Sequence, residues 1–299
     1  MNRRLAQLTL WLYPMAFRRR YGEELRALLE DAPPRMLAVL DLLRGAILAH
    51  LRPTAAGGTL VDPSDRLRAS ASGQLACWVA FAAAGFGFYK TTEDEPFAAA
   101  GHAHHLLGGT YLAVQGLAVL ASAAVILGAL PLILVALARA RAEPRLRRLI
   151  SLPPLAVLVF AGLTRVLLLL AHPEPADHTS TVGGIAFIIW SVAGLVCGAV
   201  CVVAARAALF AVAVPRWRLL AAYACGTLVT VAMAAITLAA MLYAIALFAD
   251  ASSLAASGNG PFQLVSVGVS LIVQLVVMAL TATLAATSTR RGWRAVTLD

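Results

Sequence analysis

The residue with the clearest chemical potential is an arginine inside an apolar run. Arg165 lies about six residues, or roughly 9 Å, before the outer end of its predicted membrane span. Burying a charged side chain at this depth in a membrane costs free energy, so such a residue normally has a charged or polar partner. Its presence is therefore a reason to suspect a functional site. The acidic residues nearest in predicted depth are Glu174, Asp177 and Asp250. Arg165 is therefore a candidate intramembrane functional residue, although it can also snorkel to the outer interface or brace the bundle in an ion pair.

Polar side chains recur at helical spacing within three other apolar stretches. Residues three or four positions apart share one face of a helix, so such rows can line a hydrophilic path through a bundle. More often they form interhelical hydrogen bonds, each worth about 0.6 kcal/mol in a membrane. The candidates for a polar interior are Gln115, Ser266, Ser270 and Gln274, and the matching rows add Tyr111, Ser122, Thr230 and Thr237.

Five of the six histidines gather in predicted outer loops beside acidic residues. Imidazole and carboxylate groups can together bind Zn²⁺ or Cu²⁺, and histidines can titrate below about pH 6.5 as a sensor. Their spacing matches no strong metal motif, and the alternative is an acidic, disordered loop with incidental histidines. We therefore predict no metal site. These histidines are His102, His104, His105, His172 and His178.

The cysteines and the known catalytic motifs give no sign of an enzyme. Cys197 and Cys201 share a helical face, but no histidine or carboxylate nearby completes a metal site. Buried packing is the better explanation of this pair. The chain contains no Walker A, HExxH, GxSxG or GxGxxG motif. We expect no catalytic residue and no cofactor.

Gly194 and Gly198 form a small-residue pair of the GxxxG type, with Ser191 nearby. Such a pair lets two helix backbones approach closely. The close contact can lie within one chain or across a homodimer, and the sequence leaves both open.

The first 52 residues differ in character from the rest of the chain. Their apolar spacing predicts three short helices over 3–12, 15–30 and 34–51. Asp41 and Arg44 argue against a membrane span in the third helix, because each charge would cost about 3 kcal/mol at the bilayer centre. We therefore expect this region to lie on the cytoplasmic side of the membrane.

Two strings in this region, LYPMAFRRRYGEEL at 12–25 and DLLRG at 41–45, are unusual in combination. From Leu12 to about Pro53, the chain resembles the N-terminal prefix segment of bacterial macrolide-exporter-like ABC permeases and of related short membrane proteins. The remainder of the chain does not match the permease core. The resemblance implies a helical cytoplasmic docking module.

Aromatic and basic side chains occur together in this prefix region. They can lie on anionic lipid, with the aromatic rings at the level of the headgroups. They can instead dock a soluble partner through the same stripe, or pack on the cytoplasmic ends of the spans. The docking or lipid-facing candidates are Tyr13, Phe17, Arg18, Arg19, Arg20 and Tyr21.

The composition of the 299 residues indicates an environment other than water. Hydrophobic residues make up 61% and charged residues 13%, whereas soluble domains carry about 25% charged residues. The net charge of +9 would suggest nucleic acid in a soluble protein, but here the charge is sorted along the chain. Of 24 basic side chains, 22 lie in residues 1–68, 139–148, 206–218 and 290–294. We expect contact with anionic lipid headgroups and no nucleic-acid partner.

Six apolar stretches alternate with these basic patches, and each is long enough to cross about 30 Å of hydrocarbon. Basic loops stay on the cytoplasmic side, which places both termini inside. The fold class is therefore predicted as an all-α, polytopic six-span transmembrane helical bundle. A small helical cytoplasmic N-terminal region occupies 1–68, the membrane domain 69–289 and a cytoplasmic tail 290–299. The predicted spans are about 70–89, 108–138, 152–171, 182–205, 219–248 and 263–287.

Two of these stretches exceed the thickness of a bilayer. Residues 108–138 contain Pro131, which should kink the helix or let it continue into the cytoplasm. The fourth stretch can continue to Val214, and Pro215 then ends it.

The sequence leaves two classes of function open. Arginine outnumbers lysine 23 to 1, which suggests a GC-rich bacterial genome and hence a bacterial plasma membrane. The prefix favours a non-catalytic scaffold or regulatory subunit that docks a partner through residues 1–52. The alternative is a small transporter or ABC-permease-like component that moves a solute through a polar interior near Arg165. A hydrated cavity that reaches Arg165 would favour transport, and a dry, tightly packed bundle would argue against it.

Overall fold

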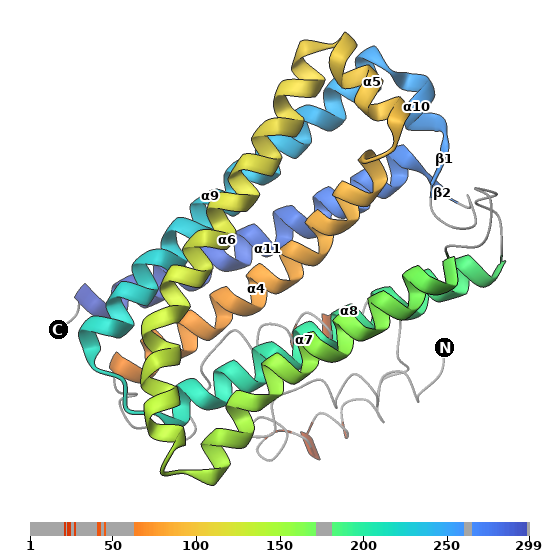
Figure 1. Cartoon of the computed structure of the whole chain (residues 1–299). Coiled ribbons are helices and arrows are strands. Elements are labelled where there is room, and N and C mark those ends of the chain that lie inside the picture. The colour runs from red at the N-terminus through yellow and green to blue at the C-terminus, as the bar shows by residue number, and fades with distance from the viewer. Residues whose placement is uncertain are drawn as a thin grey trace.

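A computed structural model describes residues 63–171, 181–259 and 265–297, together with a few isolated helical positions between 21 and 45. Its six long apolar helices confirm the predicted all-α bundle of membrane-spanning length (Figure 1). These helices are α4 Pro63–Thr92, α6 His105–Ala140, α7 Pro144–Ala171, α8 Thr181–Ala211, α9 Arg216–Asp250 and α11 Val267–Thr297.

The long helices extend beyond the apolar stretches that predict them. α4 begins at Pro63, so the first membrane helix starts inside the predicted prefix region. α6 is a single helix that continues through Pro131 to Ala140. α8 ends at Ala211, and α9 starts directly after Pro215, whose fixed φ suits the residue before a first helical turn. The helices therefore extend by a few polar residues beyond their apolar segments at both ends of the bundle.

Four of the helices form a packed core, and the remaining two form a peripheral hairpin. α6 packs along α9, α4 packs along α11, and α9 also contacts both α4 and α11. α7 and α8 pack mainly on each other and reach the core through α4 and α6 (Figure 1). In the apolar segment of α9, 56% of the residues are buried inside the protein, whereas none of the residues in that of α8 is fully buried. α9 is thus the central helix, and α8 faces lipid.

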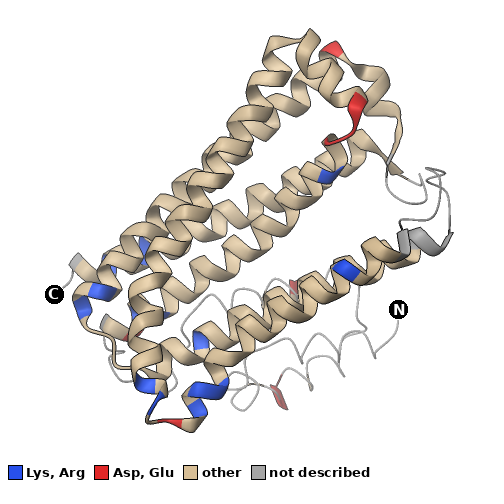
Figure 2. Ribbon diagram, viewed as in Figure 1, with Lys and Arg blue, Asp and Glu red and all other residues tan. Residues whose placement is uncertain are grey.

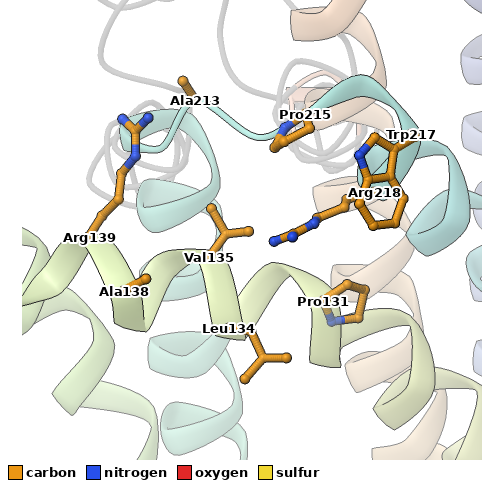
Figure 3. A pocket seen from close by; sticks show the side chains of 9 residues that line it. All are labelled: Pro131, Leu134, Val135, Ala138, Arg139, Ala213, Pro215, Trp217 and Arg218. Atoms are coloured by element: carbon orange, nitrogen blue, oxygen red, sulfur yellow. The ribbon is translucent and has the colours of Figure 1, made fainter.

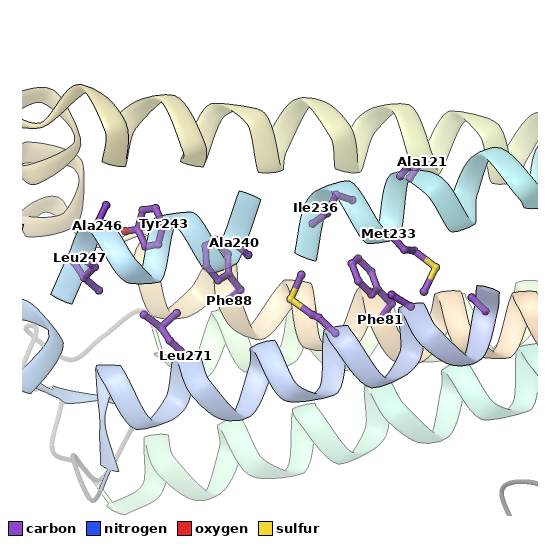
Figure 4. Packing of buried hydrophobic residues seen from close by; sticks show 14 of the residues in the cluster. Phe81, Phe88, Ala121, Met233, Ile236, Ala240, Tyr243, Ala246, Leu247 and Leu271 are labelled. Atoms are coloured by element: carbon purple, nitrogen blue, oxygen red, sulfur yellow. The ribbon is translucent and has the colours of Figure 1, made fainter. Parts of the chain in front are cut away.

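The interior of the core is filled by large aromatic and aliphatic side chains that pack against small residues of neighbouring helices. Phe88 of α4 meets Tyr243 of α9 edge-on, with ring centroids 5.3 Å apart. Phe81, Met233 and Leu271 are also almost fully buried in the same cluster (Figure 4). Alanines of α9 lie between them and allow the helices to approach, which is how packing holds membrane helices together.

Short elements close one end of the core. Their bounds are α5 Glu95–Ala103, α10 Ser252–Ala256, β1 Gly258–Asn259 and β2 Val265–Ser266, and the two strands pair antiparallel. The acidic segment that sequence reasoning allowed to be a disordered loop is thus helical, and it is fixed by the buried ring of Phe97.

Charge divides the bundle into two ends (Figure 2). The basic end carries the arginines of 139–148, 206–218 and 290–294. The acidic end carries Lys90, the acidic residues 93–95 and Asp250. The charge pattern predicts that the basic end is cytoplasmic.

Candidate functional site

A buried polar network joins α4, α9 and α11 toward the basic end. The Ser70 hydroxyl lies 3.3 Å from the Tyr223 hydroxyl and 3.3 Å from the Ser288 hydroxyl. Ser70 donates to the Ser288 carbonyl, and the Ser288 hydroxyl donates back to the Ser70 carbonyl at 3.0 Å. Tyr223 donates to the carbonyls of Ser288 and Thr289. All of these side chains are buried, so each polar group is satisfied inside the protein.

The same network continues one helical turn deeper. The Gln74 amide donates to the Thr289 hydroxyl at 2.7 Å. The Thr289 hydroxyl lies 3.0 Å from that of Thr230 and 2.9 Å from the Ala285 carbonyl. Of this network, sequence reasoning singled out only Thr230. The spacing of Ser70 and Gln74, four residues apart at the start of α4, was the signal that could have found the rest.

An apolar cavity of about 500 Å³ lies beside this network, between the core and the hairpin. α4, α6, α7, α8 and α9 all contribute to its wall. The wall is apolar apart from Ser72, Gln74 and Arg206, and its large side chains include Trp78 and Leu132. Such a lining favours hydrocarbon over water.

Small residues and prolines shape this cavity. Ala129, Ala205 and Ala208 present only methyl groups to it, and Pro153 and Pro154 lie on its α7 side. Proline side chains are compact and cannot extend into the space as leucine would. The helices that line the cavity therefore stand close together without filling it, and the cavity stays partly open to its surroundings.

One close approach fixes the α6–α9 side of the cavity. A Cβ atom added at Gly128 would lie 2.8 Å from the Cβ atom of Cys225 and 3.3 Å from the Ala222 carbonyl oxygen. Only glycine allows the two backbones to meet at this distance. Gly128 therefore sets the separation of two core helices.

Aromatic rings attach the hairpin to the core farther toward the acidic end. Trp190 of α8 lies between Phe160 of α7 and Phe86 of α4, with centroid distances of 5.3 and 5.2 Å. Its indole N–H donates to the Thr164 hydroxyl at 2.8 Å. Trp190 thus links three helices, and sequence reasoning missed it because nothing in its local spacing marks it.

A second cavity, of about 510 Å³, lies at the basic end on another face of α6 (Figure 3). Its apolar part comes from Pro131, Leu134 and Val135 of α6 and from the link between α8 and α9. Arg139 and Arg218 supply its charge, and the Arg218 guanidinium lies 4.9 Å from the ring centroid of Trp217.

The structure places Arg165 on the exposed surface of α7. Among the described residues, no acidic side chain forms an ion pair with it. Asp250, one of its three predicted partners, lies at the other side of the bundle's acidic end, 3.9 Å from the His104 imidazole. Glu174 and Asp177 lie outside the described residues. Arg165 does not line either cavity.

The other predicted polar candidates occupy several environments. Gln274 donates to Thr91 of α4 at 3.1 Å, and its own side-chain oxygen has no hydrogen-bond partner among the described residues. Ser266 accepts from a nearby backbone amide, and Ser270 is half-buried. Gln115 is exposed to lipid. None of these four residues lines either cavity.

The other polar residues predicted at helical spacing make hydrogen bonds within their own helix or ring contacts with a neighbouring one. Ser122 donates to the Ala118 carbonyl and Thr237 to the Met233 carbonyl, each at 2.8 Å. Ser122 is exposed, whereas Thr237 is buried. Tyr111 packs against Tyr243, with ring centroids 6.0 Å apart. These contacts are structural and do not define a path.

The two glycines of α8 pack against helices of the same chain. An added Cβ atom would lie 3.1 Å from Phe160 of α7 at Gly194, and 2.9 Å from Val79 of α4 at Gly198. The pair therefore holds the hairpin together and attaches it to the core. The homodimer through these glycines stays a prediction.

Possible metal ligands do not converge in the described part of the chain, where no three His, Cys, Asp or Glu side chains cluster. Cys201 lies 3.9 Å from the Pro153 carbonyl, at the α7–α8 contact, while Cys197 is half-buried. His102, His104 and His105 belong to α5 and its junction with α6.

Several predicted residues fall outside the part of the chain that the structure describes. They include the outer-loop histidines His172 and His178. The predicted prefix helices are outside it as well, apart from isolated positions. Of the docking candidates only Tyr21 is described, as a half-buried helical residue, and the others are Tyr13, Phe17, Arg18, Arg19 and Arg20.

Comparison of the chain with known protein families, with curated proteins and with solved structures finds no match. The site is therefore interpreted from its own geometry. That geometry consists of a satisfied polar network, an apolar cavity beside it, and a basic cavity at the end of α6.

Proposed function

We propose that this integral membrane protein is a non-catalytic scaffold or regulatory subunit that binds a lipid hydrocarbon chain between its core and its α7–α8 hairpin. The observation that carries the proposal is the apolar cavity of about 500 Å³ at that junction. Five helices meet around it, and its wall offers few groups that can hydrogen-bond to water. In a bilayer, the available molecule that suits such a wall is a lipid chain.

The attachment of the hairpin gives this binding a regulatory consequence. The hairpin contacts the core at the Trp190 cluster and again at the basic end, where Ala140, Leu146 and Val212 pack together. The cavity lies beside these attachments, so its occupant helps to set the position of α7 and α8. The outer faces of both helices are apolar and exposed, as suits contact with lipid, so a change in the position of the hairpin changes the surface that the protein presents within the membrane.

The first test fills the cavity and measures lipid retention. Ala129 and Ala205 line the cavity, so Ala129→Phe and Ala205→Phe should displace the chain. Ala123 and Ala199 lie on the same two helices but are exposed, so Ala123→Phe and Ala199→Phe are matched controls. Native mass spectrometry after mild detergent extraction should show loss of one bound lipid in the first pair only. Equal retention in all four variants would overturn the lipid-binding proposal.

The second test addresses partner docking, which rests on the prefix region. A chain without residues 1–52 should insert and fold, because it keeps all six long helices and the core packing described among them. It should lose proteins that co-purify with the full chain after cross-linking in native membranes. An unchanged set of partners would argue against docking through this region and leave lipid binding intact.

A further inference from the structure

We propose that the cavity at the basic end is a discrete binding site for one anionic phospholipid, such as phosphatidylglycerol, whose phosphate lies between Arg139 and Arg218. This site lies on a different face of α6 from the apolar cavity and does not depend on it. It would select a headgroup, whereas the apolar cavity selects only a hydrocarbon chain.

The cavity combines the two chemistries that a phospholipid presents. Its floor is apolar and comes from Pro131, Leu134 and Val135 on the last turns of α6. Its rim carries the guanidinium groups of Arg139 and Arg218. The Arg218 side chain reaches over α6 toward Val135 (Figure 3). A headgroup at the rim would therefore place its first methylene groups on the floor.

The charge in the cavity is of one sign. No described acidic residue forms an ion pair with Arg139 or Arg218. Arg218 is half-buried, which lowers the local dielectric around its charge. A guanidinium group presents several N–H donors in a planar fork that matches phosphate oxygens. Two such groups on the wall of one cavity favour an anionic ligand over a zwitterionic one.

Trp217 fixes the depth of the site. Its ring is 64% exposed and stacks beside the Arg218 guanidinium at 4.9 Å. Tryptophan prefers the boundary between hydrocarbon and headgroups. α9 begins at Arg216, so the positive end of its helix dipole also lies at this boundary. The cavity is therefore placed where the phosphate of a lipid in the same leaflet lies.

The main test measures binding of phosphatidylglycerol to the full chain in nanodiscs or detergent by native mass spectrometry. Arg139→Gln with Arg218→Gln should weaken binding about tenfold or more, since each guanidinium loses its charge-assisted hydrogen bonds to the phosphate. The double change Arg147→Gln with Arg148→Gln is the matched control, because both arginines are exposed at the same end but lie outside the cavity. It should change binding less than about twofold, a loss well under 1.4 kcal/mol.

A second measurement uses the emission of Trp217 and does not depend on the folding of the double arginine variant. Phosphatidylglycerol with brominated chains should quench the Trp217 emission, identified as the difference between the native chain and Trp217→Phe. Phosphatidylethanolamine with the same chains should quench it several-fold less. The native chain should bind phosphatidylglycerol equally in the presence and absence of millimolar inorganic phosphate.

Three outcomes would overturn the proposal. An equal loss in Arg147→Gln with Arg148→Gln would mean that diffuse basic charge, not this cavity, holds the lipid. Equal binding of phosphatidylethanolamine would mean that the site does not select lipids by the charge of the headgroup. Displacement by inorganic phosphate would identify a free anion as the ligand.

Discussion

The Gln74 amide donates a hydrogen bond of 2.7 Å to the Thr289 hydroxyl, across 215 positions of the chain. This bond joins the first long helix to the last one in the interior of the bundle. It also forms the boundary between the packed core and the apolar cavity, because Gln74 lines that cavity. A single side chain therefore holds two helices and sets the polar edge of the candidate site.

Replacing Gln74 by leucine should lower the free energy of unfolding by about 1 kcal/mol, within the range measured for interhelical hydrogen bonds in membranes. Thr289 keeps its contacts with Thr230 and Ala285, so the loss stays moderate. Gln115→Leu is the comparison, because Gln115 is exposed and its side-chain hydrogen bond is to Tyr111 of its own helix, so it should lose less than Gln74→Leu. Unfolding in graded denaturing detergent measures both variants. An equal loss in both would contradict a specific role for Gln74.

Adding one methyl group at Gly128 should destabilise the bundle by about 1–3 kcal/mol, as overpacking does. The added Cβ atom would meet the Cβ atom of Cys225 at 2.8 Å, so α6 and α9 must separate. Gly116→Ala on the same helix has no atom within 4 Å of the added Cβ atom and should be neutral or slightly stabilising. Cys225→Gly should recover part of the loss in Gly128→Ala. Absence of any recovery would locate the strain elsewhere.

The attachment of the hairpin should depend on the rings around Trp190 more than on its hydrogen bond. Trp190→Ala removes both contributions, and Thr164→Val removes only the hydrogen bond, which is 2.8 Å long. Each aromatic pair contributes about 0.5–1.5 kcal/mol beyond its buried area. Spin labels at Leu158 and Val276, both exposed, should show a broader distance distribution in Trp190→Ala. An equal broadening in Thr164→Val would assign the attachment to the hydrogen bond.

The orientation inferred from the arginines can be measured with single cysteines in a background without native cysteines. Ala142→Cys lies at the basic end and should react with a membrane-impermeant maleimide only after the cells are opened. Glu95→Cys lies at the acidic end and should react in intact cells. Both positions are exposed, so accessibility differs only through the membrane. The reverse labelling pattern would invert the predicted topology.

Hydropathy and charge alone were enough to predict the six long helices, because each needs about 20 apolar residues and their ends carry the arginines. The arrangement of those helices could not be predicted in the same way. Lipid is as apolar as a protein core, so the lipid-facing α8 and the buried α9 look alike in composition. Gln74 and Gln115 illustrate the same limit, since one is buried in a network and the other faces lipid.

The candidate site was less predictable than the fold. The cavity forms where alanines of different helices face one another. The spacing of residues within one helix does not predict which helices pack together. Arg165 was conspicuous as a lone charge, yet it lies on the exposed surface of the hairpin. Arg139 and Arg218 were read as signs of orientation and of general contact with anionic lipid, but not as two residues that share one cavity. Contacts between distant segments are the information that composition does not carry.

α4 cannot pair with α11 until nearly the whole chain has been synthesised. Ser70 and Ser288 are 218 positions apart, so at 5–20 residues per second the ribosome delivers the second about 10–40 s after the first. During that interval, the partly synthesised bundle carries an open polar seam within the membrane. Closure of this seam therefore has to wait until α11 has been synthesised. A chain cut short before α11 would keep the seam exposed and could be recognised as unfinished by membrane proteases.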